Sequence, residues 1–531
     1  MAAESPTAGK RLVLVAMIFA VAMMFIDQTI VALAIPELEK DLSLSSTGAQ
    51  WIINGYLLSL SALFAFGGKL ADVLGHRRMV MVGVAGFATS SALCGATPTG
   101  DLGEAWMIFF RIVQGAFAAL LFPAALAIVV AAFPLRERGR ALAIFFAVTG
   151  ALTSVGPLAG GYLTEWTWRS IFWINVPVAI VALILTVRAK PAESKHPGRI
   201  DYRGAVLISA AMGLVVLGLQ QSAVWGWEDV RTIGCIVVGL LLLAGFVAEQ
   251  LGKDEPLIQM RIFAQRAFSA DNAVLFLMSA TFVPLFFFAS IYAQVALGES
   301  ASNAGLFLLV FFGGFAIASQ WGGRMLDEGG AKRPVVLGCA LSAVGFYLWG
   351  NQLPDLSFDQ QWYYLAMAGA GIGLVLGPVS TDAINRAPHT SYGEVTGITQ
   401  TVRNFGASLG LAIMGSVFLS QNVSRVEDTL VARGLSVERA DEIARAMTSS
   451  GGGGDQSAFA DHAGAGARAL FDAIQLDVAE STKTVAFIMA SVMAVAFIVA
   501  RLWMTSGRAP DPLEQAAKEP EPAGAAPAGQ P

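Results

Sequence analysis

Long apolar runs separated by short polar connections fill most of the sequence. Crossing about 30 Å of hydrocarbon takes roughly 20 residues of helix, and a helix satisfies its own backbone hydrogen bonds in lipid. Each apolar run therefore predicts one membrane-spanning helix. The runs predict fourteen such helices, at residues 12–35, 49–71, 78–97, 105–130, 140–163, 169–187, 204–222, 232–250, 268–296, 303–325, 334–350, 361–385, 394–420 and 483–503.

The composition agrees with this pattern. Of 531 residues, 55% are hydrophobic and 14% are charged, and the mean hydropathy is +0.62. These values are unusual for a soluble domain. The expected fold class is an all-α polytopic membrane protein of the plasma membrane. The first run is too long for a signal-peptide core and no small-residue cleavage site follows it, so we expect it to remain as the first span.

The sequence offers little for enzymatic or metal chemistry. Cys94, Cys235 and Cys339 lie in three separate predicted spans, and the four His residues fall in loops or at span boundaries. Neither a disulfide framework nor a metal-ligand spacing results. The phosphate-binding pattern GxxxxGK[ST] is also absent. We therefore expect no enzyme activity, no metal, no cofactor and no nucleic-acid partner.

The charged residues predict an orientation. Basic residues gather in the even-numbered connections, as in the cluster Arg136, Arg138 and Arg140, whereas the short odd-numbered connections are acidic, as at Glu37 and Asp41. Lys and Arg near span ends favour the cytoplasmic side. The pattern therefore predicts that both termini are cytoplasmic. One span more or fewer would invert every later connection, so the bias also favours fourteen spans.

An internal repeat predicts two homologous halves. GGKLADVLGHRRMVMVG at residues 67–83 aligns without a gap on GGRMLDEGGAKRPVVLG at residues 322–338. Duplicated parallel halves are typical of a transporter that rocks around a central site. We expect two pseudo-symmetric six-helix halves with two inserted helices: a cytoplasmic N-terminus (1–11), an N-terminal half (12–187), a linker with two extra membrane helices (188–266), a C-terminal half (267–503) with a long outer loop (421–481), and a disordered cytoplasmic tail (504–531).

Several motifs resemble a known family. GGKLADVLGHRR resembles the cytoplasmic loop signature of the major facilitator superfamily, and GALTSVGPLAGG in the fifth span resembles the signature of its antiporter branch. FIDQTIVALAIP, RIVQGAFAA and WRSIFWINVP are similar to segments of the fourteen-span drug:proton antiporters. The resemblance covers the chain from about residue 12 to 503, apart from the long outer loop.

The repeated loop predicts a latch on the cytoplasmic face. Its glycines allow a tight turn, and Asp72 can pair with Arg77 or Arg78 and with a helix end. Such a latch can break when the halves rock; the alternative is a positive-inside anchor with an incidental carboxylate. Val73 and His76 stand where the family has basic residues, so we expect the latch to be weaker, or to loosen with pH through His76. The latch residues are Gly68, Asp72, Gly75, Arg77 and Arg78, and in the repeat Gly323, Asp327, Gly330 and Arg333.

The fifth span carries a glycine-rich stretch. Its small residues permit close helix contact, and its proline removes one intrahelical hydrogen bond and bends the helix. Packing alone can explain these residues; only the resemblance implies antiport and export. The antiporter-motif residues are Gly150, Gly156, Pro157, Gly160 and Gly161.

Two ionisable residues share a depth in the N-terminal half. Asp27 lies about 12 Å from the outer end of the first span and Arg111 about 9 Å from the outer end of the fourth, at 1.5 Å per residue. A bare charge at such depth costs at least about 2.5–3.5 kcal/mol, so the two are a candidate pair. We expect Asp27 to alternate between protonated and ionised states, or between a proton and a cationic substrate, while Arg111 adjusts its affinity. The alternative is a static ion pair that stabilises the fold.

Other charges lie towards the inner ends of the C-terminal spans. Asp382 and Arg403, in the twelfth and thirteenth spans, are secondary candidates for the transport site. For Asp271 and Asp382 a boundary or structural role is favoured, because residues so near the interface can reach water.

The leading functional hypothesis is a proton-coupled antiporter that exports amphipathic, possibly cationic, small molecules such as antibiotics or dyes. The alternative is a dedicated transporter of a single metabolite, lipid precursor, sugar or siderophore on the same fold. The energy source would be the proton gradient, without a cofactor. The expected partners are the small-molecule substrate, protons and the lipid bilayer, and the sequence does not identify a periplasmic or cell-envelope adaptor.

Overall fold

The computed structural model describes residues 6–133, 159–191, 201–386, 392–449 and 464–508, with positions 141, 144, 145, 148, 149, 152 and 156. Every regular element within these ranges is a helix. The elements are α1 (Pro6–Leu42), α2 (Ser46–Leu74), α3 (His76–Gly95), α4 (Gly103–Ala132), α6 (Ser170–Trp173), α7 (Asn175–Ala189), α8 (Tyr202–Trp225), α9 (Val230–Leu251), η1 (Met260–Ala264), α10 (Arg266–Ile291), η2 (Tyr292–Ala296), α11 (Ala301–Gly329), α12 (Lys332–Gln352), η3 (Leu353–Asp355), η4 (Phe358–Gln360), α13 (Trp362–Asn385), α14 (Tyr392–Ala432), α15 (Val437–Ser449) and α17 (Gly464–Trp503).

The predicted spans agree with these helices. In the described ranges, thirteen helices are long and apolar enough to cross a membrane, with α6 and α7 together forming one of them. Each coincides with one predicted span. Half of the predicted fifth span, at 140–163, lies outside the described residues, and Gly150 and Pro157 are in that half. The all-helical membrane fold is therefore confirmed.

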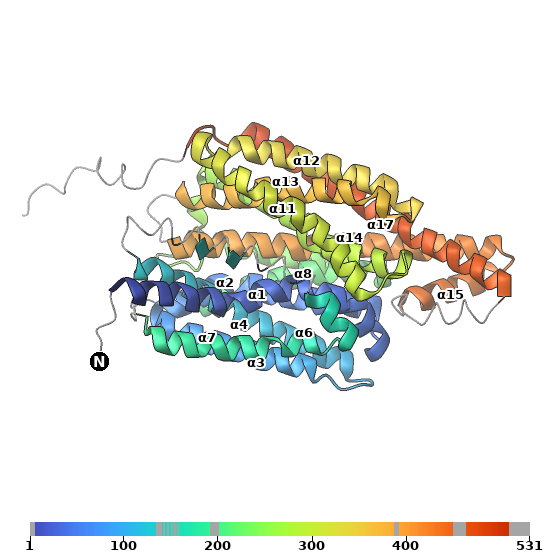
Figure 1. Ribbon diagram of the computed structural model, residues 1–531, viewed down its shortest axis with the longest axis horizontal. Helices are drawn as coiled ribbons and strands as arrows, with labels where there is room; N and C mark the ends of the chain where they lie inside the picture. Colours follow the sequence, from blue (N-terminus) through green and yellow to red (C-terminus); the bar gives the residue numbers. More distant parts are fainter. Residues whose placement is uncertain are drawn as a thin grey trace, which may run out of the picture.

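The structure differs from the prediction in the long outer connection. α14 continues to Ala432 and α17 begins at Gly464, so both helices extend well into the predicted loop at 421–481. Figure 1 shows these ends projecting beyond the bundle together with α15. Val426 and Leu430 of α14 are buried against Ala440 and Ala444 of α15. This small apolar core stabilises the extension, whereas the hydropathy of single segments predicted only where the apolar runs end.

The helices form two groups. In the first group α2 and α3 pack against α4, and α1 packs against α7 and α4. In the second group α13 packs against α11 and α12, α17 packs against α12 and α10, and α14 packs against α10. Figure 1 shows the first group below and α11, α12, α13 and α17 above, with α14 between them. The groups meet where α2 contacts α14 and where α1 contacts α10.

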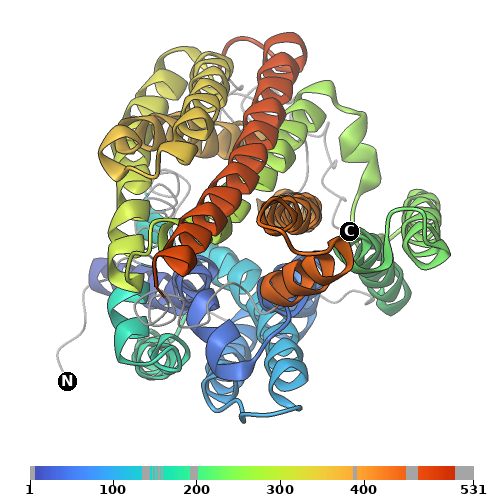
Figure 2. The same cartoon turned by 90° about the vertical axis from the view of Figure 1, so that its right-hand side faces the viewer.

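α8 and α9 form a separate antiparallel pair at one edge of the bundle, seen in green in Figure 2. α8 packs on α2 and α14, which belong to different groups. Asp201 caps α8 and also accepts a hydrogen bond from Lys253, just beyond α9, at 2.7 Å. Burial alone would raise the pKa of Asp201, but hydrogen bonds from Lys253 and Gln250 outweigh it and lower the pKa. The pair is therefore held together at its α8 start and α9 end.

The two copies of the repeated motif end their helices in the same way. α2 ends before Gly75, which has φ 104°, and α11 ends before Gly330, which has φ 85°. These two glycines occupy aligned positions of the repeat. A side chain is strained at positive φ, so glycine is required at both turns. We call the end of the bundle that carries Gly75 and Gly330 the motif end.

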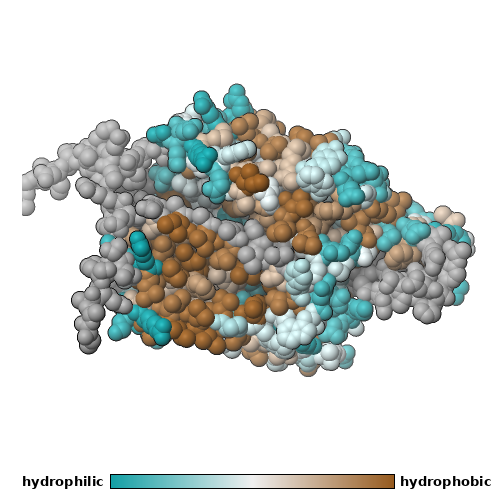
Figure 3. Space-filling view, viewed as in Figure 1, coloured by the Kyte–Doolittle hydropathy of each residue, from teal (hydrophilic) through white to brown (hydrophobic). Residues whose placement is uncertain are grey.

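The surface carries the apolar belt of a membrane protein. Large apolar side chains are exposed on α7, α8, α9 and α11, among them Ile180, Val206, Leu241 and Ile317. Figure 3 shows broad hydrophobic areas along the bundle and hydrophilic side chains towards its ends. A soluble monomer rarely exposes so much contiguous apolar surface. The chain is a multi-pass membrane protein.

A glycine contact between α11 and α13 generates a stability prediction. A Cβ added at Gly369 would collide with the backbone of Phe311, whereas one added at Gly377, on the same helix, meets nothing within 4 Å. Overpacking at a tight contact costs about 1–3 kcal/mol. We expect Gly369→Ala to lower the thermal midpoint in detergent and Gly377→Ala to leave it near wild type. Equal midpoints for the two variants would contradict the close packing of α11 on α13.

Candidate functional site

Asp27 and Arg111 meet in the interior of the first helix group. α1 carries Asp27, whose side chain is 0% exposed, and α4 carries Arg111, whose side chain is 1% exposed. The Arg111 Nη1 lies 2.6 Å from the Asp27 Oδ2. The shared depth in the sequence pointed to this arrangement, although the role of the pair in proton coupling stays a prediction.

Neighbouring groups hold the Arg111 guanidinium in place. Its Nε donates to the backbone carbonyl of Ile52 on α2 at 2.9 Å. The Tyr56 ring, one turn further along α2, lies 4.4 Å from the guanidinium carbon, and the Phe172 ring of α6 lies 6.0 Å away. A desolvated guanidinium gains from an aromatic face as well as from its hydrogen bonds. Elements α1, α2, α4 and α6 therefore converge on one cation.

Gln114 completes the cluster and was not among the predicted site residues. Its Oε1 accepts a hydrogen bond from the Arg111 Nη1 at 2.8 Å, and its Nε2 donates to the Asp27 Oδ1 at 3.0 Å. The i,i+3 spacing of Arg111 and Gln114 places both on one face of α4, which is a signal the sequence contained. Tyr56 was missed for another reason, because its role depends on how α2 packs on α4.

The hydrogen bonds limit what Asp27 can do in this conformation. One carboxylate oxygen accepts from Arg111 and the other from Gln114. The two donors therefore fix the orientation of the carboxylate. Any movement of α4 relative to α1 that lengthens the contact would leave a buried charge without its partner. The geometry thus links the pairing of Asp27 to the separation of two helices.

The described glycines of the antiporter motif lie close to α1. A Cβ at Gly156 would collide with the Thr29 side chain, and one at Gly160 would lie 2.9 Å from Ile30. Both contacts fall within one turn of Asp27. Gly161 faces the other helix group instead, because a Cβ there would lie 2.7 Å from the Ala301 carbonyl at the start of α11. The motif thus touches both the helix of the candidate site and the opposite group.

The repeated motif at the motif end makes different contacts from those predicted. Asp72 contacts the His76 Nε2 at 3.0 Å. The described residues give no contact of Asp72 with Arg77 or Arg78, so the predicted pairing is wrong in this conformation. His76 is the first residue of α3, and the turn at Gly75 brings its ring back to Asp72 near the end of α2.

The remaining latch residues are placed mainly by packing. A Cβ added at Gly68 would lie 3.6 Å from the Cβ of Pro123 on α4. A Cβ added at Gly323 would meet nothing within 4 Å. Asp327 is exposed, and Arg333 lies beside Gly329, one residue before the turn glycine. Their role as a latch stays a prediction.

Asp382 and Arg403 do not meet. Asp382 accepts a hydrogen bond from Arg386 at 2.7 Å, and Arg403 donates to Gln400 at 2.7 Å. Asp271 and Asp382 are each only 1% exposed. The expectation that these two carboxylates reach water is therefore wrong, because the packing of α10 and α13 covers them. Hydropathy indicates distance from the interface but not which face of a helix is covered.

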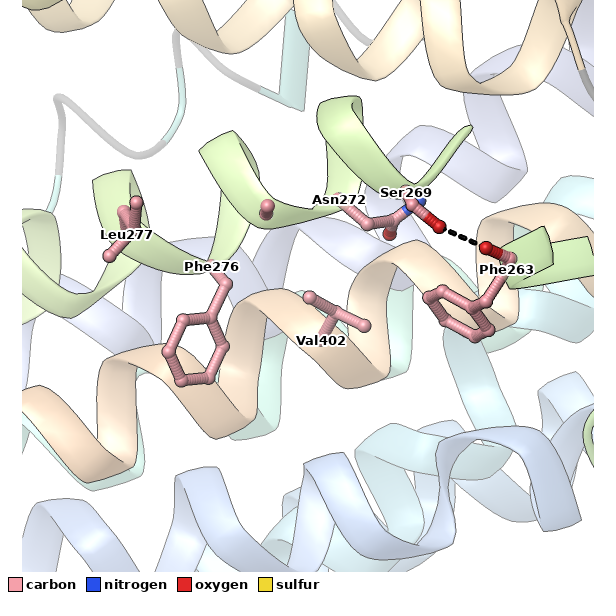
Figure 4. A pocket seen from close by; sticks show the side chains of 7 residues that line it. Phe263, Ser269, Asn272, Phe276, Leu277 and Val402 are labelled. Carbon is pink, nitrogen blue, oxygen red and sulfur yellow. Dashed lines mark hydrogen bonds between the residues drawn. The ribbon is translucent and has the colours of Figure 1, made fainter. Parts of the chain in front are cut away.

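An apolar cavity of about 400 Å³ opens where α10, η1 and α14 meet near the motif end. Figure 4 shows the rings of Phe263 and Phe276 and the Val402 side chain around it, with Asn272 and Ser269 above. Its full lining is Phe263, Ser269, Asn272, Ala273, Phe276, Leu277 and Val402. Within the described ranges, no three His, Cys, Asp or Glu side chains converge as a metal ion would require.

The amino-acid sequence matches a family model described as "Major Facilitator Superfamily" over residues 17–411. It is 35% identical to the tetracenomycin C resistance and export protein of Streptomyces glaucescens, over 79% of this chain and 78% of that protein. It is 27% identical to multidrug resistance protein 3 of Bacillus subtilis, over 79% of this chain and 82% of that protein.

Among solved structures, the fold is similar to a bacterial homologue of the human lysosomal transporter Spinster in an inward-facing, unoccupied conformation. The TM-score is 0.61 at 16% sequence identity, and the match covers 93% of this chain and 98% of that chain. At this identity the likeness concerns the fold alone.

The buried cluster predicts an asymmetric response to mutation. Arg111→Ala leaves the Asp27 charge buried without its cation, which typically costs about 3–5 kcal/mol of unfolding free energy. The double variant Asp27→Asn with Arg111→Met removes both charges, so we expect it to unfold at a higher temperature in detergent than Arg111→Ala alone. If the double variant is the less stable of the two, the contact is not the charge-matching pair described here.

Proposed function

The chain belongs to the Major Facilitator Superfamily, and on that premise we propose that it exports amphipathic small molecules in exchange for protons. The exchange would proceed by alternating access, with the motif end and both termini on the cytoplasmic side of the plasma membrane. The observation that carries the proposal is the fully buried contact of Asp27 with Arg111. A static fold has little need of such a pair, since apolar residues of similar volume are often as stable.

Export is supported by the similar proteins. One is named for resistance to and export of tetracenomycin C, and another for multidrug resistance. Export against a gradient requires an energy source, and the described residues contain a buried carboxylate that can exchange a proton but no converging metal ligands. The proton gradient is the source that fits these groups.

The energetics of one-for-one exchange are sufficient. Moving one proton inward through about 100 mV contributes about 2.3 kcal/mol, and a difference of one pH unit adds about 1.4 kcal/mol. The sum of roughly 3.7 kcal/mol sustains a gradient of about 500-fold for a neutral substrate. No second energy source is needed for a useful degree of efflux.

The contacts between the two helix groups suit a rocking motion. Asn54 of α2 accepts a hydrogen bond from Ser408 of α14 at 2.9 Å, and Ser61 donates to the Thr401 carbonyl at 2.8 Å. At the other side, Gln294 donates to the Leu33 carbonyl at 3.1 Å. These bonds are neutral, and the described residues show no ion pair between the groups. Neutral hydrogen bonds contribute about 0.5–1.5 kcal/mol each, so they can break and re-form during transport.

A dedicated exporter of one antibiotic is the second candidate. The protein of Streptomyces glaucescens is named for a single compound, and its identity to this chain is higher than that of the multidrug protein. Transport of one compound from a broad panel would favour this alternative, whereas movement of several unrelated dyes would favour multidrug export.

Proton-driven efflux in everted vesicles tests the proposal. With an imposed pH gradient and a panel of cationic, neutral and acidic fluorophores and antibiotics, we expect Asp27→Asn to abolish proton-driven substrate movement, because the variant cannot exchange a proton at this site. Asp101→Asn removes an exposed carboxylate between α3 and α4 and serves as the matched control. It should transport like wild type. Full activity of Asp27→Asn at normal membrane levels would exclude Asp27 as the coupling residue.

A further inference from the structure

Two further buried carboxylates lie close together at the motif end of the second helix group. Asp271 is in the second turn of α10, and Asp382 is in the last turn of α13. The two helix ends share one apolar cluster, which includes Phe268 and Ala383. Asp271 lies within electrostatic range of both Asp382 and Arg386. The site is separate from the cluster of Asp27, which is built entirely from the first group.

The two carboxylates differ in their hydrogen-bond partners. The Arg386 Nε donates to the Asp382 Oδ2 at 2.7 Å, so Asp382 has a cation of its own. The Asp271 Oδ2 is buried and accepts no hydrogen bond, and the same is true of the Asp382 Oδ1. The side-chain oxygen of Asn272 beside the cavity also lacks a donor. The site is thus rich in buried acceptors and poor in donors.

A proton bound to one of the two carboxylates would supply a missing hydrogen-bond donor. An ionised carboxylate only accepts hydrogen bonds, whereas a protonated one also donates. One guanidinium matches one carboxylate, so ionising both would leave an uncompensated negative charge away from water. We propose that Asp271 holds a proton in this conformation and forms, with Asp382 and Arg386, a second proton-binding site of the transporter.

Other basic side chains on the elements that pack against α10 do not neutralise Asp271. Arg403 of α14 donates to Gln400. Arg266, at the start of α10 itself, donates to the Leu502 carbonyl. Arg261 of η1, Arg324 of α11 and Arg501 of α17 are exposed. His389 lies outside the described residues. Within the described ranges, Arg386 is therefore the cation for which the two carboxylates compete.

Loss of this proton would weaken a contact that reaches the turn of the repeated motif. The Arg386 Nη2 donates to the Gly507 carbonyl at 2.7 Å, beyond the end of α17. Gly507 lies directly against Gly330, the turn glycine that ends α11. An ionised Asp271 would compete for Arg386 and weaken its bond to Gly507. The proton would thereby control how firmly the segment after α17 is held against the motif turn.

Infrared spectroscopy of the purified full-length protein tests the proposal without substrate or gradient. A protonated carboxyl has a C=O stretching band that is separate from the carboxylate bands and shifts in deuterated water. In difference spectra at neutral pH, we expect wild type minus Asp271→Asn to contain this band with the intensity of about one carboxyl. Wild type minus Asp327→Asn, which removes an exposed carboxylate of the same helix group, should not contain it.

A second variant keeps the test decisive if Asp271→Asn fails to fold. Asp382→Asn releases Arg386 to pair with Asp271 and removes the neighbouring negative charge, so the band should be lost although Asp271 is intact. Retention of the full band in Asp382→Asn, or in folded Asp271→Asn, would overturn the proposal. The band reports on proton binding alone, so failure of drug efflux in vesicles would leave its interpretation unchanged.

Discussion

A charge buried inside a membrane protein must be matched where it lies, and the contact of Asp27 with Arg111 meets that constraint. Four elements contribute to it: α1 and α4 supply the charges, α2 supplies a carbonyl and an aromatic face, and α6 supplies a second ring. Because both side chains are buried, each of these helices has to hold its position for the pair to be satisfied. The ion pair therefore depends on the arrangement of the whole first helix group.

The repeat shows how specialised this site is. With the 255-residue offset that aligns the two motifs and Pro123 with Pro378, Tyr56, Arg111 and Gln114 correspond to Phe311, Ala366 and Gly369. The helix pairs also correspond, since α2 packs on α4 as α11 packs on α13. In the second group the polar cluster is thus replaced by an aromatic ring and two small residues that allow backbone contact. The α2–α4 pair contains the buried charged cluster, whereas the α11–α13 pair is joined by close backbone packing.

The sequence predicted much of this architecture because hydropathy and charge act over whole segments. It located the described membrane helices, and the common depth of Asp27 and Arg111 indicated their pairing. It failed where a contact depends on the face of a helix. Asp72 was assigned to Arg77 or Arg78 rather than His76, and Asp382 was placed within reach of water. The extension of α14 beyond residue 420 was missed because its stability comes from packing on α15 and not from the membrane.

Charged contacts and neutral contacts lie in different parts of the structure. In the described residues, ion pairs lie within one helix group, or within the α8–α9 pair and its flanking residues, whereas the hydrogen bonds that join α2 to α14 involve neutral side chains and backbone carbonyls. A neutral interface can open without leaving a charge stranded in lipid. The charged pairs lie inside the groups, where their charges stay matched. The buried pairs can therefore remain intact while the neutral contacts between the groups break and re-form.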